Sequence, residues 1–123
     1  MSARPASART GAKASAAKAA LPAFAATLAA LGDETRLRLV ARLSTEGPLS
    51  IARLADGADV TRQGITKHLH VLSSAGLVHG VRHGREQIWE LDPKRLNETR
   101  RYLDRISDQW DDALARLKRL VER

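Results

Sequence analysis

The sequence of this 123-residue chain predicts a mostly α-helical domain with a small β-hairpin and a long C-terminal helix. Three observations lead to that fold class. Apolar residues recur at helical spacing over much of the chain, and two short runs of β-favouring residues are joined through a glycine. A C-terminal apolar seam then continues for more than three heptads. The length fits one small domain, which we place at residues 21–123.

Residues 1–20 differ from the rest in composition. They carry four basic residues and no acid among Ala and Ser, and they lack the apolar block of a secretory signal, so we expect a disordered basic tail. No stretch approaches the ~18 apolar residues that a membrane span needs, so we expect a cytoplasmic, nucleoid-associated protein with no membrane partner. The chain has no cysteine, which excludes disulfides and thiolate metal sites.

The distribution of charge points to an acidic partner. The formal net charge is +7, of which the four basic residues of the tail contribute +4, leaving +3 for the rest. Between Val60 and Arg85 there is no Asp or Glu, and all four histidines of the protein fall inside this window. An acid-free window in a chain otherwise rich in acids suits a polyanion such as nucleic acid.

Two helices are expected before this window. Pro22 lies just inside the apolar run LPAFAATLAAL, which predicts a helix that Gly32 ends. Asp33 suits the N-cap of a second helix, which Gly47 and Pro48 stop. The residues that line one side of this second helix at helical spacing are Leu37, Val40, Ala41 and Ser44.

A helix-turn-helix candidate follows. Ser50 caps the short segment IARLADGA, and Gly57 supplies the turn after it. Thr61 caps the next segment, TRQGITKHLHVL, whose helix ends at Gly76 in a left-handed C-cap position. Its apolar stripe is Ile65, Leu69 and Leu72. Two short helices joined by a tight turn, the second basic on its outer face, are typical of this motif.

A hairpin and a long helix complete the chain. The runs Leu77–Arg82 and Glu86–Leu91 are joined through His83-Gly84-Arg85, which predicts a hairpin with a basic tip. Asp92 and Pro93 then cap and start the final helix. Its apolar seam is Leu96, Thr99, Leu103, Ile106, Trp110, Ala113, Leu117 and Leu120. So long a seam exceeds what three short helices and a hairpin can cover, so we expect a partner helix from a second copy.

The order of these elements resembles a winged helix-turn-helix. The stretches "LGDETRLRLVARLSTEGPLSIARLA" and "VTRQGITKHLHVLSSAGLVHGVRHGREQIWEL" are similar to the ArsR family of bacterial transcriptional regulators. The most specific pieces are Asp33-Glu34-Thr35-Arg36, Thr66-Lys67-His68-Leu69 and Ala75-Gly76-Leu77-Val78. The resemblance covers about residues 21–121. It implies a homodimer joined by the first and last helices, with two recognition helices in successive major grooves of a pseudo-palindromic double-stranded operator.

The sequence departs from the family's metal-released repressors. Their cysteine-pair site would fall in the helix containing Ile51 to Leu54, where there is no cysteine. Their other site takes acidic and histidine ligands from the terminal helix, and residues 92–123 contain no histidine. The chain is more similar to the metal-independent branch, whose members often act as autorepressors. We therefore expect a repressor with no metal site and no cofactor.

The candidate site residues follow from these elements. Arg and Lys can donate to guanine, Gln can bracket adenine, and a threonine methyl can touch thymine. The DNA-binding candidates, on the recognition helix and at the hairpin tip, are Thr61, Arg62, Gln63, Thr66, Lys67, His70, Arg82, His83 and Arg85. The dimer-interface candidates are Leu21, Phe24, Leu28, Leu103, Ile106, Trp110, Leu114 and Leu117.

Other notable residues are expected to be structural. His68 and His70 lie about 200° apart on a helix and cannot chelate one ion together. His68 flanks the apolar stripe, so we expect it to bond a neighbouring backbone or carboxylate group. Trp89 and Trp110 are interpreted as core or interface residues. Gly64 is expected to permit close packing against the preceding helix or a close approach to DNA.

Two other functions remain open at this stage. The protein is either the repressor described above or a sensor released by a small molecule or an unconventional metal site. A winged-helix adaptor that binds protein rather than DNA is the remaining alternative. An enzyme is not expected, because the sequence has no nucleophile elbow, phosphate loop or HExxH spacing.

Overall fold

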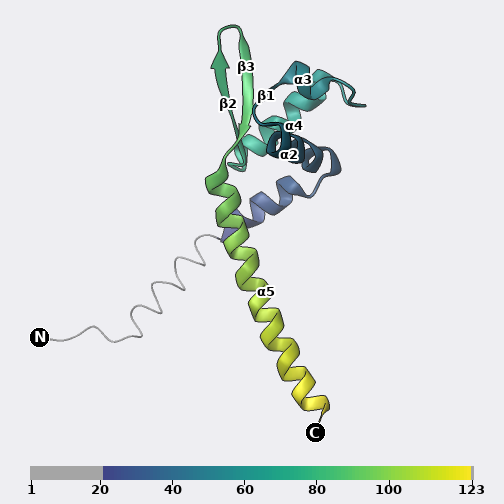
Figure 1. Ribbon diagram of the computed structural model, residues 1–123, viewed down its shortest axis with the longest axis vertical. Helices are drawn as coiled ribbons and strands as arrows, with labels where there is room; N and C mark the ends of the chain where they lie inside the picture. The colour runs from purple at the N-terminus through teal and green to yellow at the C-terminus, as the bar shows by residue number, and fades with distance from the viewer. Residues whose placement is uncertain (1–20, 123) are drawn as a thin grey trace, which may run out of the picture.

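The computed structural model describes residues 21–122 and confirms the expected fold class (Figure 1). Residues 21–31 are helical and are called the N-terminal helix below. The elements that follow are α2 (Glu34–Glu46), β1 (Leu49–Ser50), α3 (Ile51–Ala55), α4 (Arg62–Ser74), β2 (Val78–His83), β3 (Glu86–Leu91) and α5 (Pro93–Val121). The predicted tail, residues 1–20, lies outside the described residues.

Polar caps begin the helices where the sequence predicts them. The side chains of Asp33, Ser50, Thr61 and Asp92 each accept a backbone N–H two or three residues further along. Each bond satisfies one of the N–H groups that the first turn of a helix leaves without a partner. At the other end of α4, Gly76 has φ of 77°, the left-handed conformation expected there.

The core is built around α4 and confirms its predicted stripe. Ile65, Leu69 and Leu72 are at most 1% exposed, and Leu54 of α3 packs against them. Burial of each such side chain stabilises the fold by about 1.5–3 kcal/mol. Trp89 of β3, 3% exposed, belongs to the same cluster, which confirms its interpretation as a core residue.

The buried face of α2 differs in part from the predicted one, of which Val40 is half-buried and packs against the core. Leu39 and Leu43 are the buried residues of this helix, whereas Leu37 is 50% exposed and Ala41 is also exposed. Leucines at positions 37, 39 and 43 offer two apolar stripes, and the sequence alone does not choose between them. Packing against α4 and β3 selects the stripe of Leu39 and Leu43.

The wing contains one strand more than predicted. β2 and β3 form the expected antiparallel hairpin, and β1 pairs with the other edge of β3, giving the order β1-β3-β2. Leu49 of β1 lies opposite Trp89. At the tip, Gly84 has φ of 63° and Arg85 keeps a negative φ, as a type II′ hairpin turn requires.

The long helix α5 leaves the domain. Figure 1 shows it extending away from the other elements, with the N-terminal helix crossing near its start and the hairpin projecting the opposite way. Its 29 residues span about 43 Å. The N-terminal helix packs there by stacking Phe24 on Tyr102, with 4.0 Å between ring centroids. Within residues 21–122 no helix has the length and apolar character to span a bilayer.

Candidate nucleic-acid interface

The recognition helix α4 is anchored on one face and open on the other. Its apolar stripe is buried, as described above, and a close turn fixes its start. A Cβ added to Gly64 would lie 2.7 Å from Cγ1 of Val60, which is too close for any other residue without a shift. Glycine is therefore needed for packing against the turn before α4. The sequence prediction had named the preceding helix or DNA as the close neighbour.

The candidate residues of α4 lie on its open face. Arg62, Gln63, Lys67 and His70 are exposed, and Thr66 is half-buried. Two hydroxyl groups have partners within the helix. Thr66 donates to the carbonyl of Arg62 at 2.8 Å, and Thr61 accepts the N–H of Gly64 at 3.0 Å. Within residues 21–122, the side chains of Arg62, Gln63 and Lys67 form no hydrogen bond or ion pair, so they are open to a ligand.

The wing adds a second basic region beside α4. Arg82, His83 and Arg85 are exposed at or next to the turn between β2 and β3. The base of the hairpin contacts α4, since the ring of His70 lies 6.1 Å from that of Trp89 at a tilt of 50°. Helix and wing are thus held together by core packing, while their basic side chains remain in solvent.

His68 contacts the expected carboxylate and, more closely, an arginine that was not predicted. Nη1 of Arg36 lies 3.3 Å from Nδ1 of His68, while the Asp33 carboxylate is 3.9 Å from that nitrogen. A guanidinium can only donate, so Nδ1 accepts in this contact. Arg36 also donates from Nε to the carbonyl of Ala30 at 2.6 Å. This arginine therefore ties the N-terminal helix, α2 and α4 together.

The same cluster stabilises the charged form of Asp33. The backbone N–H of Arg36 donates to its carboxylate at 3.0 Å, and the guanidinium charge of Arg36 lies nearby. These interactions hold the pKa of Asp33 below its ordinary value of 3.8, although partial desolvation acts in the opposite direction. The N-cap of α2 is thus ionised under neutral conditions.

Comparison with known proteins identifies the scaffold. A family model described as a helix-turn-helix domain matches residues 31–81. The HTH-type transcriptional regulator Rv2034 of Mycobacterium tuberculosis is 38% identical over 93 residues, which cover 76% of this chain and 83% of that protein. An ArsR-like transcriptional regulator from Rhodococcus sp. RHA1 has a solved structure that is 38% identical, with a TM-score of 0.72. The match covers 83% of this chain and 95% of the Rhodococcus chain.

The chain belongs to the ArsR family of transcriptional regulators. Its winged helix-turn-helix is the DNA-binding part of such a regulator, and α4 occupies the place of the recognition helix. A more distant structure, 23% identical with a TM-score of 0.59, covers 79% of this chain and 86% of its own. That protein, from Mycobacterium bovis, is described as a homodimeric winged helix-turn-helix DNA-binding domain and a possible ArsR-family regulator.

The histidines of this ArsR-family chain are dispersed. His79 bonds Glu90 across the hairpin at 2.7 Å, His68 contacts Arg36, and His83 lies at the wing tip. Among residues 21–122, no group of three or more His, Asp or Glu side chains is placed to hold a metal ion.

The dimer-interface candidates divide into a covered and an exposed set. Phe24 is only 9% exposed because it stacks on Tyr102 of its own chain, and Ile106 is half-buried. Thr99 of the seam is also buried within the chain. The exposed members, from 41% to 64%, are Leu21, Leu28, Leu103, Trp110, Leu114 and Leu117. Trp110 is therefore not a core residue of the described chain.

Sequence reasoning missed three residues that organise the ArsR-family scaffold. Arg36 bonds three elements, as described above. Arg95 of α5 lies against Gly76 at the end of α4, and Thr27 is fully buried in the N-terminal helix. From residue type alone, an arginine or a threonine on a helix is expected to be exposed to solvent. Only the DETR motif gave a signal for Arg36, and no pattern singled out the other two.

Proposed function

We propose that this ArsR-family regulator binds a specific double-stranded DNA operator as a homodimer and represses transcription by occupying a promoter. We further propose that it does so without a metal at the family's usual sensor positions. The observation that carries the proposal is the basic surface formed by the outer face of α4 together with the wing. A regulator that binds DNA in this way would act in the cytoplasm, at the nucleoid.

The proposed division of labour follows from the position of each side chain. Gln63 and Lys67 lie at the centre of the exposed face of α4, where a helix inserted in the major groove meets base edges. Arg62 sits nearer the apolar stripe and is suited to a phosphate. The wing residues Arg82 and Arg85 are placed for the adjacent minor groove or its phosphates.

Dimerisation is supported by the exposed seam of α5. Leu103, Trp110 and Leu117 lie within about 40° of one another on the helix at 100° per residue, and each is about half exposed or more. A contiguous apolar face of this kind usually marks a protein interface. The homodimeric description of the Mycobacterium bovis structure supports the same assembly. A two-fold dimer would bind half-sites one helical turn, about 34 Å, apart.

Selection of binding sites from random DNA tests the central proposal. The full-length protein should enrich a palindromic sequence and shift it specifically, with affinity that falls steeply with salt. The double variant Arg62→Ala/Lys67→Ala should lose this binding, while Lys118→Ala, at the far end of α5, should retain it. Failure to enrich any sequence, or full affinity in the double variant, would show that this surface does not bind DNA.

Two further measurements address repression and metals. A promoter containing the selected operator should drive less reporter expression when the protein is present, and increased expression would contradict repression. Addition of Zn(II), then of a chelator, should leave operator affinity unchanged if no metal is sensed. Release of DNA by Zn(II) would favour an unconventional metal sensor instead.

A further inference from the structure

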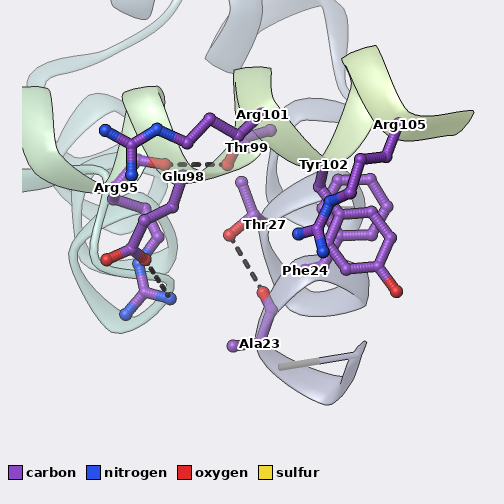
Figure 2. A pocket seen from close by; sticks show the side chains of 9 residues that line it. All are labelled: Ala23, Phe24, Thr27, Arg95, Glu98, Thr99, Arg101, Tyr102 and Arg105. Carbon is purple, nitrogen blue, oxygen red and sulfur yellow. Dashed lines mark hydrogen bonds and ion pairs between the residues drawn. The ribbon is translucent and has the colours of Figure 1, made fainter. Parts of the chain in front are cut away.

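A cavity of about 200 Å³ lies between the N-terminal helix and the first turns of α5. Figure 2 shows Arg95 and Glu98 at one end of it, the aromatic pair of Phe24 and Tyr102 with Arg105 at the other, and Thr27 between them. This cavity takes no part in the proposed DNA contacts. Its volume is below the ~300 Å³ at which pockets for drug-sized ligands begin, so a fitting molecule would be small.

The charges around the cavity favour an anion. Its described lining contains three arginines, Arg95, Arg101 and Arg105, and one acid, Glu98. Nη1 of Arg95 lies 3.7 Å from a carboxylate oxygen of Glu98, and within residues 21–122 neither of the other two arginines forms an ion pair. A guanidinium group presents only donors and matches the geometry of a carboxylate.

The hydroxyl groups of the cavity reinforce this preference. Thr27 donates to the carbonyl of Ala23 at 3.0 Å, and Thr99 donates to that of Arg95 at 2.8 Å. Each hydroxyl has a single proton, and both protons are used within their own helices. The side-chain donors left to a ligand are therefore the guanidinium N–H groups and the phenol of Tyr102.

The other end of the cavity suits a flat apolar group. The rings of Phe24 and Tyr102 are stacked at an interplanar angle of 16°, and the guanidinium of Arg105 lies 5.0 Å from the centre of the tyrosine ring. The same arginine is thus held next to an aromatic wall by a cation–π contact. A ligand that combines a ring with a negative charge would use the wall and the arginine together.

We propose that this cavity binds a small aromatic carboxylate that acts as an effector of the regulator. The carboxylate pairs with Arg105, and the ring lies against Phe24 and Tyr102. The guanidinium of Arg101 lies at the opposite end of the cavity, near Arg95 and Glu98 (Figure 2). Binding at this cavity does not depend on the DNA-binding proposal. The effector role does rest on the DNA-binding proposal.

Arg95 connects the cavity to the recognition helix. A Cβ added to Gly76 would lie 2.9 Å from Nε and 3.1 Å from Nη2 of Arg95, so this guanidinium rests directly on Gly76. Gly76 follows the C-cap of α4, and its N–H donates to the carbonyl of Ser73 in the last turn at 2.9 Å. A negative charge bound in the cavity attracts the guanidinium of Arg95 from a distance and so changes its contact with the end of α4. The ligand thereby has a different affinity for two arrangements of α4, as coupling requires.

On α5, the cavity faces a different direction from the exposed part of the seam. At 100° per residue, Glu98, Tyr102 and Arg105 centre about 110° around α5 from Leu103, Trp110 and Leu117. The cavity therefore flanks the exposed seam of this helix.

Calorimetric titration of the full-length protein tests the cavity. Benzoate should bind saturably, whereas benzamide, its uncharged analogue, should not. Inorganic phosphate should bind more weakly than benzoate because it gains nothing from the aromatic wall. Equal binding of phosphate and benzoate, or no binding of benzoate, would overturn the proposal.

Variants locate the site. Arg105→Gln should weaken benzoate binding at least tenfold, and Arg105→Lys should retain part of it. Arg116→Gln, which removes one positive charge further along α5, should bind as the unaltered protein does. Arg105 is exposed, so an unchanged melting temperature should accompany the loss. Equal weakening in Arg116→Gln would mean a general charge effect and would overturn the assignment.

Operator binding tests the effector role separately. With the selected operator, saturating benzoate should change affinity by about fivefold or more, and Arg95→Ala should abolish that change. An unchanged operator affinity at saturating benzoate would overturn the effector role. If no operator is bound even without benzoate, the DNA-binding proposal fails and the effector role fails with it, whereas the calorimetric result still decides whether the cavity binds a carboxylate.

Discussion

Replacing Lys67 by alanine should lower the salt dependence of operator binding by a calculable amount. The structure exposes four arginine and lysine side chains on the recognition helix and wing, namely Arg62, Lys67, Arg82 and Arg85. A homodimer presents each of them twice, giving eight charges. If all eight neutralise phosphates, the logarithm of the binding constant should fall with the logarithm of salt concentration with a slope of about −7.

Lys67→Ala removes two of these charges from the dimer. The slope should then become about −5.4, because each phosphate contact contributes about 0.9. Between 50 and 200 mM salt the unaltered protein should lose affinity about 10⁴-fold, and the variant only about 10³-fold. Fluorescence anisotropy of a labelled operator over this range measures both slopes.

The control for this experiment is Lys118→Ala. Lys118 has a side chain that is 77% exposed and lies in the last turns of α5, so its loss changes the net charge equally without touching the proposed interface. Its slope should match that of the unaltered protein. Identical slopes for Lys67→Ala and the unaltered protein would refute the phosphate contact. A loss confined to one base pair of the operator would instead assign Lys67 to a guanine.

Three further predictions follow from burial and charge. Leu69→Ala should lower the free energy of unfolding in urea by about 2–5 kcal/mol, whereas Val71→Ala, on the exposed side of α4, should cost less than about 1 kcal/mol. A small effect of Leu69→Ala would contradict the assigned core. In Asp33→Asn the melting temperature should fall less steeply at acid pH than in the unaltered protein. The lowered pKa of the Asp33 carboxyl stabilises the fold above pH 3.8, and that stabilisation is lost as the pH falls further. Thermal unfolding from pH 6 to pH 2 measures this difference, and the same pH dependence of the melting temperature in both proteins would contradict it. Leu103→Glu should shift sedimentation from dimer to monomer, and Leu37→Glu, an equally exposed leucine of α2, should not. An unchanged dimer in Leu103→Glu would remove the seam from the interface.

The recognition helix shows how far local sequence information reaches. Its cap, its buried stripe and its terminal glycine were all predicted, because each depends on residues within one or two turns of the same helix. The hairpin was predicted for the same reason, since two β-favouring runs and a glycine turn lie next to each other in the chain. Both ends of β2 lie one residue later than predicted.

The failures concern contacts between distant residues. β1 has only two residues, Leu49 and Ser50, and its sequence does not indicate a strand. The segment is a strand because it pairs with β3. The arginine contact of His68, 32 residues away in the chain, was not predicted, although the carboxylate contact was. The stacking of Phe24 on Tyr102 was not predicted either, and the place of Phe24 in the dimer interface stays a prediction.

The sequence by itself determined where the helices begin and end, which face of α4 enters the core and which residues are left for an acidic partner. It did so because caps, glycine turns and periodic apolar positions act over a few neighbouring residues. Only the tertiary structure decided which stripe of α2 is buried, how much of the α5 seam stays exposed, and that three arginines surround a cavity next to the end of α4. Those features depend on which helices cross, and the free energy that selects a crossing comes from the surfaces of both partners, which no single stretch of sequence contains.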